Sequence, residues 1–186
     1  GYPSHLLDIL RSLLPNNCKK EPNIVILTPG PLNSAYYEHS FLADMMGIEL
    51  VQGSDLFVDN NIAYMKTTEG PKRVDIIYRR VDDEYLDPLY YKSDSLLGIP
   101  GIMNAYKVGN VNICSAPGAG IADDKAIYTF MPEIIKFYLG EEPVLKNIKT
   151  WKCYNEIEKK YVINNLKDLV VKEVHGSGGY GMLIGA

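Results

Sequence analysis

NIVILTPGPLNSAYYEHSFLADMMGIELVQ, residues 23–52, sets the fold class of this chain. Its first six residues, NIVILT, form a short, β-branched and continuously apolar run, which is typical of a strand buried on both faces. Ser34 can cap a helix that runs to Met46, where Gly47 supplies the stop. Residues 48–52 then return to strand character. A strand, a helix and a strand in about thirty residues form a βαβ unit, and this predicts a parallel sheet with a right-handed crossover.

Elements on both sides continue this α/β pattern. Residues 4–14 carry leucines at helical spacing, and Pro15 ends the resulting amphipathic helix. Further strands are predicted at residues 74–80 and 111–114. Between them and the βαβ unit, residues 55–67 read as a hairpin, which we expect at the edge of the sheet.

The sequence changes character near residue 115. A long helix is expected from Asp123 to Leu139, followed by a short helix near residues 155–165 and a strand at residues 169–172. We therefore predict three segments. They are an N-terminal helix at 1–22, an α/β domain at 23–114 and a different module at 115–186.

Composition excludes several classes of protein. The chain has 186 residues, a net charge of −4 and no basic stretch, which argues against a general nucleic-acid binder. Its three cysteines are far apart, so neither a disulfide framework nor a CxxC metal site can be built from them. No apolar segment is long enough to cross a bilayer. We predict a soluble, cytoplasmic protein with neither a membrane nor a nucleic acid as partner.

The last eighteen residues, LVVKEVHGSGGYGMLIGA, suggest a ligand site. An apolar strand ends at Lys172, a glycine-dense bend follows, and a second apolar strand returns. Glycines let the backbone approach a ligand, and their amides can converge on phosphate oxygens beside the lysine. A flexible hairpin turn with a solvated lysine fits the spacing equally well. The Walker A loop and the Rossmann fingerprint do not fit, because both lead into a helix.

Four stretches in this order resemble the ATP-grasp superfamily, in its circularly permuted branch of bacterial relatives of glutathionylspermidine synthetase. They are residues 27–39 (LTPGPLNSAYYEH), 74–88 (VDIIYRRVDDEYLDP), 109–128 (GNVNICSAPGAGIADDKAIY) and 169–185 (LVVKEVHGSGGYGMLIG). The resemblance implies a parallel-sheet, flavodoxin/Rossmann-like α/β pre-ATP-grasp domain followed by an α+β ATP-grasp portion. It also implies ATP- and Mg²⁺-dependent ligation of a carboxylate to an amine through an acyl phosphate.

The resemblance assigns nucleotide-binding roles to two lysines and a glycine-rich lid. Lys172 would contact the phosphates of ATP. The expected cofactor-binding residues are Lys125, Lys172, Gly176, Ser177, Gly178, Gly179, Tyr180 and Gly181. Lys125 can also be read as a solvated residue in the first turn of a helix. Asp123 and Asp124 are interpreted as helix-capping carboxylates rather than metal ligands.

A second group of candidates follows the strand at residues 74–80. The expected catalytic residues are Arg79, Arg80, Asp82 and Asp83. Cations are needed to neutralise a transferring phosphoryl group, and the planar fork of arginine suits phosphate or carboxylate oxygens. Relatives in the resembled family use an arginine and an acidic residue in a comparable loop. The alternative is a surface ion-pair cluster contributing about 0–1 kcal/mol.

The helix that begins near Ser34 also has two interpretations. Residues 37–39 can line a substrate cleft beyond the first strand. The favoured alternative is a core-facing stripe formed by Tyr36, Phe41 and Leu42. Glu38 and His39 would then face water. Elsewhere, His175 in the lid is not expected to bind a ligand, and Trp151 and Tyr180 are interpreted as packing groups.

Two departures from the resembled family predict a fragment. The Glu-x-Asn metal motif is expected in a segment ahead of the first strand, so the metal ligands of this chain are unknown. The ATP-grasp sheet should also continue past Ala186. The acidic residue expected a few positions after the lid lysine is replaced by Gly176, and Glu173 would lie on the opposite face of a continuing strand. The chain is therefore predicted to be an incomplete ATP-grasp portion, inactive alone and in need of the missing remainder of that domain.

Two rival functions stay open at this point. One is a nucleotide-binding or interaction module without catalysis. The other is a bare flavodoxin-like domain with a disordered glycine-rich tail. The carboxylate and amine substrates and the oligomeric state cannot be read from residue spacing.

Overall fold

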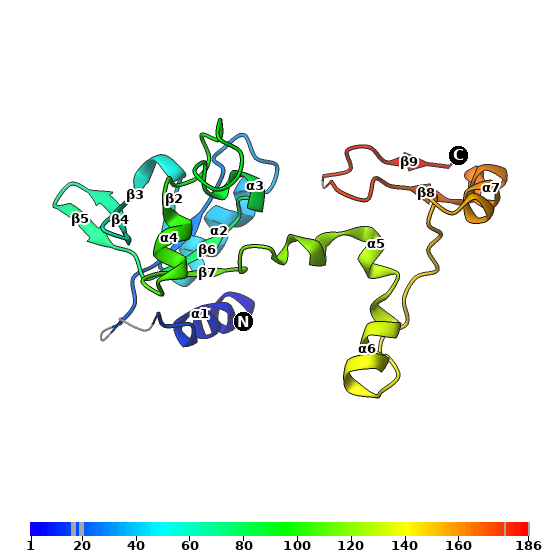
Figure 1. Cartoon of the computed structure of the whole chain (residues 1–186), viewed down its shortest axis with the longest axis horizontal. Coiled ribbons are helices and arrows are strands. Elements are labelled where there is room, and N and C mark those ends of the chain that lie inside the picture. Colours follow the sequence, from blue (N-terminus) through cyan, green and yellow to red (C-terminus); the bar gives the residue numbers. More distant parts are fainter. Residues whose placement is uncertain (16–17, 19–20, 177, 186) are drawn as a thin grey trace. The chain divides into compact units, whose positions relative to one another are not determined.

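The computed structural model describes residues 1–15, 18, 21–176 and 178–185. The chain divides into two compact units, residues 1–118 and residues 119–186 (Figure 1). Each unit is described by itself below.

A four-stranded parallel sheet forms the centre of the first unit. Its strands are β1 (Ile24–Leu27), β2 (Glu49–Val51), β6 (Ile76–Arg79) and β7 (Asn112–Cys114), in the order β2-β1-β6-β7. Every neighbouring pair is parallel, which confirms the predicted parallel sheet. All four residues of β1 are buried.

The alternation of side chains along β1 explains why this strand is apolar throughout. Ile24 and Ile26 belong to one core cluster, with Leu10 and Leu42 from the helices α1 (Tyr2–Ser12) and α2 (Tyr36–Met46). Val25 and Leu27 belong to a second cluster on the other face, which includes α4 (Ile102–Lys107). A strand covered on both faces has no solvent side, so no alternating polar residue is tolerated. Gly47 ends α2 with a left-handed φ of 65°, as predicted.

The hairpin is part of a sheet of its own. It comprises β3 (Leu56–Asp59), β4 (Ile62–Thr67) and β5 (Gly70–Arg73), joined as an antiparallel sheet in that order. Asn60 and Asn61 have φ values of 48° and 59°, which the two-residue turn requires. The expectation of a hairpin at the edge of the parallel sheet is wrong. Instead, Leu56, Ala63 and Met65 pack into the second core cluster, so this small sheet covers a face of the core.

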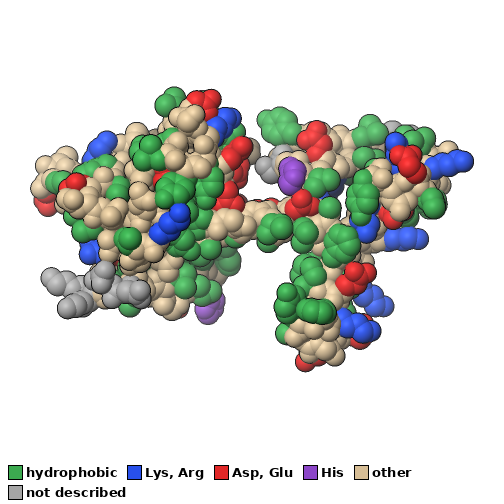
Figure 2. Space-filling model, viewed as in Figure 1, with side chains coloured by type: hydrophobic (Ala, Val, Ile, Leu, Met, Phe, Trp, Pro, Cys, Tyr) green, Lys and Arg blue, Asp and Glu red, His purple; other side chains and the backbone are tan. Residues whose placement is uncertain are grey.

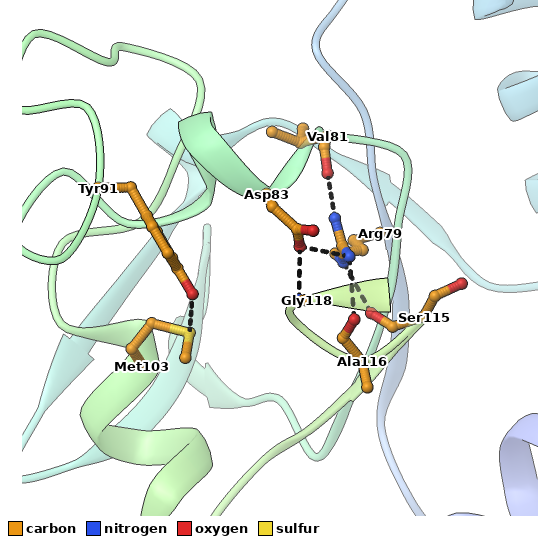
Figure 3. Close-up of polar contacts among 8 residues, drawn as sticks. All are labelled: Arg79, Val81, Asp83, Tyr91, Met103, Ser115, Ala116 and Gly118. Atoms are coloured by element: carbon orange, nitrogen blue, oxygen red, sulfur yellow. Dashed lines mark hydrogen bonds and ion pairs between the residues drawn. The ribbon is translucent and has the colours of Figure 1, made fainter. Parts of the chain in front are cut away.

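Two short connections complete the first unit. The turn η1 (Gly53–Asp55) follows β2, and α3 (Asp83–Leu86) follows β6. Asp87, which is fully buried, accepts hydrogen bonds from the N–H groups of Leu89, Gly101 and Met103 at 2.9–3.1 Å. This carboxylate closes the loop between α3 and α4, and Tyr91 adds a hydrogen bond to Met103 Sδ at 3.9 Å (Figure 3).

A polar network fastens the amino-terminal ends of the parallel strands. Asp75, only 8% exposed, accepts a hydrogen bond from the N–H of Asn23 at 2.9 Å and lies 3.0 Å from Arg73 Nε. Asn23 Nδ2 donates to the carbonyl of Arg73 at 2.7 Å, and Arg73 Nη2 donates to the carbonyl of Asn110 at 3.1 Å. These contacts join the residues that precede β1, β6 and β7, and they fix the register at this end of the sheet.

The second unit consists of short elements. They are η2 (Ala119–Asp123), α5 (Lys125–Tyr128), α6 (Met131–Leu139), α7 (Glu156–Asn164), η3 (Leu166–Asp168), β8 (Val170–Val171) and β9 (Leu183–Ile184). Strands β8 and β9 pair antiparallel, so the strand, glycine bend and returning strand form a hairpin as predicted.

The predicted long helix from Asp123 to Leu139 is broken in the structure. Helix α5 ends at Tyr128 and α6 begins at Met131, with Pro132 in its first turn. Proline has no N–H for the carbonyl four residues earlier. That carbonyl, of Tyr128, accepts a hydrogen bond from Asn147 Nδ2 at 2.7 Å instead. The prediction of one continuous helix is therefore wrong, because Pro132 divides the segment into α5 and α6.

The second unit buries little apolar surface. Among its described residues, Val162 is the only buried hydrophobic side chain. Large apolar residues such as Phe137, Leu145 and Ile157 are each at least 81% exposed. Hydrophobic side chains are visible on the surface around α6 in Figure 2. This unit therefore has no core comparable to that of the first.

The Asp75 network provides the first prediction. Replacing Asp75 with alanine removes the acceptor of the Asn23 N–H and leaves the Arg73 guanidinium without its counter-charge. We expect the free energy of unfolding of the first unit to fall by about 1–3 kcal/mol, measured by urea denaturation. The control is Glu21→Ala, which breaks an ion pair to Arg11 at 3.0 Å between side chains 50% and 75% exposed. That change should lower stability by less than about 1 kcal/mol. Equal effects of the two variants would contradict the structural role of Asp75.

Candidate functional site

The carboxyl-terminal edge of the parallel sheet gathers most of the polar candidates of the first unit. Parallel strands end at one edge, so the residues that follow them become neighbours. Thr28 follows β1, Gln52 follows β2, Arg80 follows β6 and Ser115 follows β7. Open α/β sheets place their ligands beyond this edge.

Arg79 is enclosed by protein oxygens (Figure 3). Its Nε donates to the carbonyl of Ser115 at 2.7 Å, its Nη1 to that of Val81 at 2.8 Å and its Nη2 to that of Ala116 at 3.1 Å. Nη2 also lies 2.6 Å from Asp83 Oδ1, and the side chain of Arg79 is only 7% exposed. All three guanidinium nitrogens are engaged, so this arginine joins the segment after β6 to the segment after β7.

Asp83 supports the same connection. Its Oδ1 accepts a hydrogen bond from the N–H of Gly118 at 3.1 Å in addition to the Arg79 contact. Asp82, in contrast, is exposed at the start of α3. Of the four predicted catalytic residues, the structure thus brings Arg79 and Asp83 into one buried contact and leaves Asp82 in solvent.

Arg80 has a different environment from its neighbour. Its Nη2 lies 2.7 Å from Glu38 Oε1, and its Nη1 donates to the hydroxyl of Tyr78 at 3.1 Å. The backbone N–H of Arg80 donates to the carbonyl of Leu27 at 2.7 Å, which fixes its Cα beside β1. The Arg80 side chain is 27% exposed, and that of Glu38 is 54% exposed. This guanidinium is therefore held at the edge of the sheet and is open to solvent.

Helix α2 is rotated relative to the predicted stripe. Its buried residues are His39, Leu42, Ala43 and Met46. The expectations that His39 faces water and that Phe41 faces the core are both wrong, because His39 is 2% and Phe41 46% exposed. The spacing from His39 to Met46 is the i, i+3, i+4, i+7 pattern of a helix face. That pattern was readable in the sequence once histidine is allowed a core position. Exposed Tyr37 stacks on Phe41, with ring centroids 6.3 Å apart.

His39 has a buried partner at the end of β1. Its Nδ1 lies 2.9 Å from Thr28 Oγ1, and the same oxygen accepts a hydrogen bond from the N–H of Gly30 at 3.2 Å. Burial lowers the pKa of His39, the positive charge of Arg80 lowers it further, and the carboxylate of Glu38 partly offsets both. The imidazole is thus neutral at pH 7 and fixes the loop between β1 and α2.

Gln52 is a residue at this edge that the sequence analysis did not single out. Gly30 has a φ of 106°, and a Cβ at that position would lie 2.6 Å from Gln52 Oε1. The amide of Gln52 therefore occupies the space that any side chain at position 30 would need. Its signal in the sequence is only its place after the second strand, where a polar residue follows the buried Val51.

In the second unit, the structure joins Lys125 to the glycine-rich bend. Lys125 Nζ donates to the carbonyl of Gly176 at 2.7 Å, and its backbone N–H donates to that of Val174 at 3.2 Å. Asp124 Oδ1 accepts from the N–H groups of Ala126 and Ile127, which confirms it as a helix cap. These contacts connect two predicted nucleotide-binding segments that are about fifty residues apart in the sequence.

The bend itself has the backbone geometry that glycine permits. Its four glycines have φ values of 130°, 65°, 81° and 62°; they are Gly176, Gly178, Gly179 and Gly181. Ser177 lies outside the described residues. Lys172 is exposed just after the end of β8. The predicted lid is therefore a bend whose conformation most other residues would strain.

Three further predictions concern Glu173, Tyr180 and Trp151. The first two are wrong, and the third is confirmed. Strand β8 ends at Val171, so Glu173 does not lie on the opposite face of a continuing strand. Its carboxylate lies against Gly181, where an added Cβ would collide with it. Tyr180 is 80% exposed, so its interpretation as a packing group is wrong. Trp151 does pack, stacking on Tyr161 with centroids 5.0 Å apart.

Comparison with known proteins identifies the family. A family model described as a circularly permuted ATP-grasp matches residues 1–186. The chain belongs to the circularly permuted ATP-grasp family. An uncharacterized protein of Synechocystis is 52% identical over 185 residues, which cover 100% of this chain and 38% of that protein. An uncharacterized protein of Mycobacterium tuberculosis is 50% identical over 184 residues, covering 99% of the chain and 33% of the relative.

A third relative has a name that states a reaction. The Frankia alni protein named "Putative glutamate–cysteine ligase 2-3" is 40% identical over 183 residues, covering 98% of this chain and 21% of that protein. The chain therefore spans between about a fifth and two fifths of the length of these curated relatives.

The ATP-grasp family generally uses ATP and Mg²⁺. The described residues suit the phosphates of ATP better than they suit a metal ion. The glycine bend, Lys125 and Lys172 offer amides and ammonium groups of the kind that bind phosphate oxygens. No group of three His, Cys, Asp or Glu side chains suited to a metal ion occurs within residues 1–15, 18, 21–176 and 178–185. These described residues thus offer groups for the phosphates of ATP but no ligand set for a divalent cation. In the same part of the chain, no helix has the length and apolarity needed to cross a membrane.

The buried histidine gives the second prediction. The pKa of His39 is lower in the folded protein than in the unfolded chain, where it is near the ordinary value of 6.5. The unfolded chain therefore binds the proton more readily, and protonation favours unfolding. The contribution of His39 to stability is fully present above pH 6.5 and decreases as the pH falls below that value. Urea denaturation between pH 8 and pH 5 should show this loss.

The matched controls separate this effect from general acid sensitivity. His39→Gln should flatten the loss of stability below pH 6.5. His5→Gln should leave it unchanged, since His5 is exposed. A His39→Gln variant with the same pH dependence as the wild type would contradict the assignment.

Proposed function

We propose that this chain is part of an ATP- and Mg²⁺-dependent ligase that joins a carboxylate to an amine through an acyl phosphate. One observation carries the proposal: in a chain of the circularly permuted ATP-grasp family, Lys125 is hydrogen-bonded to the glycine bend that follows Lys172. Two cations and a bend of glycines with positive φ are groups of the kind that bind phosphate oxygens. The name of the Frankia alni relative supports the same class of reaction.

In the proposed reaction, an oxygen of the substrate carboxylate attacks the γ-phosphorus of ATP and displaces ADP. The nitrogen of the amine then attacks the acyl carbon, and inorganic phosphate leaves. Lys125, Lys172 and the amides of Gly176, Gly178, Gly179 and Gly181 would bind the phosphates, with Tyr180 in the lid.

The last residue of β6, Arg79, and the three polar residues Arg80, Asp82 and Asp83 after it are proposed to have different roles. Arg80 would neutralise an anionic oxygen of the substrate, because its guanidinium reaches solvent. Arg79 and Asp83 would act indirectly, by holding the loop that carries Arg80. Asp82 is exposed beside them and remains a candidate for the acidic role.

The domain assignment belongs to the same proposal. Residues 23–114 would form the flavodoxin/Rossmann-like pre-ATP-grasp domain, after an N-terminal helix at residues 1–22. Residues 115–186 would form the first part of the ATP-grasp module, as in relatives of glutathionylspermidine synthetase. Because the chain spans only 38% of the Synechocystis protein and less of the others, the activity is proposed for the longer protein, in the cytoplasm.

A non-catalytic nucleotide-binding module is the second candidate. Gly176 stands where an acidic residue is expected in the lid, and the described residues contain no metal-binding group of three. Both functions predict that ATP stabilises the longer protein. Only the ligase predicts ADP release that depends on a carboxylate and an amine.

This difference gives the third prediction. The longer protein, supplied with ATP, Mg²⁺, glutamate and a panel of amines including cysteine, should release ADP only when both substrates are present. The 186-residue chain under the same conditions should release none, since it spans a minor part of its relatives. ADP is measured with a coupled assay. Turnover by the isolated chain would contradict the fragment interpretation, and ATP binding without ADP release would favour the non-catalytic module.

The lid lysine gives the fourth prediction. Lys172→Ala in the longer protein should weaken ATP binding by roughly tenfold or more, because a charge-assisted contact to phosphate is lost. Titration calorimetry with ATP measures the change. Lys146→Ala is the matched control, since Lys146 is an exposed lysine of the same unit outside the lid. Equal affinities of the two variants would show that Lys172 does not contact the nucleotide.

A further inference from the structure

Two adjacent arginines at the end of β6 are used in opposite ways. All three guanidinium nitrogens of Arg79 donate to protein oxygens, and its side chain is 7% exposed. Arg80 uses only its two terminal nitrogens within the part of the chain that the structure describes, and its Nε makes no hydrogen bond there. Its side chain is 27% exposed. Arg80 is thus the member of the pair with donors left for a ligand.

Two groups hold the terminal nitrogens of Arg80. Glu38 Oε1 lies 2.7 Å from Nη2, and the hydroxyl of Tyr78 accepts from Nη1 at 3.1 Å. The guanidinium carbon is 5.9 Å from the centroid of the Tyr78 ring. A guanidinium held at two nitrogens has a defined plane, whereas a free arginine side chain samples many rotamers.

Glu38 is itself held by the fold. It lies in the first turn of α2, next to His39, which is anchored to Thr28 at 2.9 Å. The first turn is also fastened by the N–H of Tyr36, which donates to the carbonyl of Asn33 at 3.0 Å. The backbone of Glu38 is therefore fixed relative to β1, and its carboxylate reaches the guanidinium of Arg80 from this fixed helix turn.

We infer that Glu38 is a positioning residue, which holds the guanidinium of Arg80 in one orientation so that it can receive an oxyanion of the substrate. The oxyanion is a carboxylate or a phosphoryl oxygen. The orientation of Arg80 is a property of this chain alone, while its effect on catalysis rests on the function proposed above. A preoriented guanidinium loses less rotamer freedom when it binds the oxyanion.

The alternative role for Glu38 is masking, in which it weakens the attraction of Arg80 for anions. A carboxylate 2.7 Å from Arg80 also neutralises its charge, so masking makes predictions that differ from those of positioning. Glutamine keeps an acceptor at the same position without the charge, and alanine removes both. Positioning predicts that kcat falls in the order wild type, Glu38→Gln, Glu38→Ala. Masking predicts that both variants are as active as the wild type or more active.

The fifth prediction tests this on the longer protein and on this chain. In the longer protein, Glu38→Ala should lower kcat by roughly tenfold or more and Glu38→Gln by about two- to threefold, with the KM for ATP unchanged. In the 186-residue chain, the side-chain N–H signals of Arg80 in ¹⁵N NMR should be resolved in the wild type and averaged in Glu38→Ala. The matched control is Glu21→Ala, which breaks the exposed pair with Arg11 and should change neither readout.

Each result decides one part of the inference. Averaged Arg80 signals together with a lower kcat support it. Arg80 signals unaffected by Glu38→Ala overturn it, and so does a kcat that stays equal or rises. If the wild-type longer protein forms no ADP, the proposed function fails, and the NMR comparison alone then decides whether Glu38 orients Arg80. Addition of acetate and of phosphate to the chain in separate arms shows which oxyanion shifts the Arg80 signals.

Discussion

The complete burial of β1 is the constraint on which the first unit depends. Both faces of this strand are covered, so Ile24, Val25, Ile26 and Leu27 can carry no chemistry of their own. Polar groups are confined to the two ends of the strands. At the amino end, Asp75 accepts a backbone hydrogen bond and forms an ion pair with Arg73, which fixes the register. At the carboxyl end, some polar side chains, such as Arg80, reach solvent and are not used only for structural contacts. The candidate site lies at this end.

At the same edge, two adjacent arginines have different roles, one structural and one available for a ligand. Arg79 and Arg80 have identical side chains, but successive residues of a strand point in opposite directions. One guanidinium enters a cage of backbone carbonyls, and the other reaches the surface. The neutral His39 beside Arg80 adds no second positive charge at pH 7, because burial lowers its pKa. Arg80 and Glu38 are therefore the charged groups that act on His39 at this edge.

The sequence predicted the features that have local causes. The parallel sheet follows from a continuously apolar strand, the end of α2 from Gly47, and the β8–β9 hairpin from two apolar runs around a glycine bend. The errors arose where a residue type was given its average behaviour. The prediction that His39 faces water overlooks its helical spacing with Leu42 and Met46, and the prediction of one long helix ignores the proline at residue 132. Contacts such as Lys125 with Gly176 depend on tertiary structure, which residue spacing does not determine.

The scarcity of buried apolar side chains in the second unit has a consequence for how the chain opens. With Val162 as the only buried hydrophobic among its described residues, the backbone hydrogen bonds of α6 and α7 are protected by little more than the helices themselves. Amide protons there exchange with solvent through small local fluctuations, whereas those of β1 exchange only when the whole first unit unfolds. A protease would accordingly cut the chain first after residue 118, and the parallel sheet would survive as a resistant product.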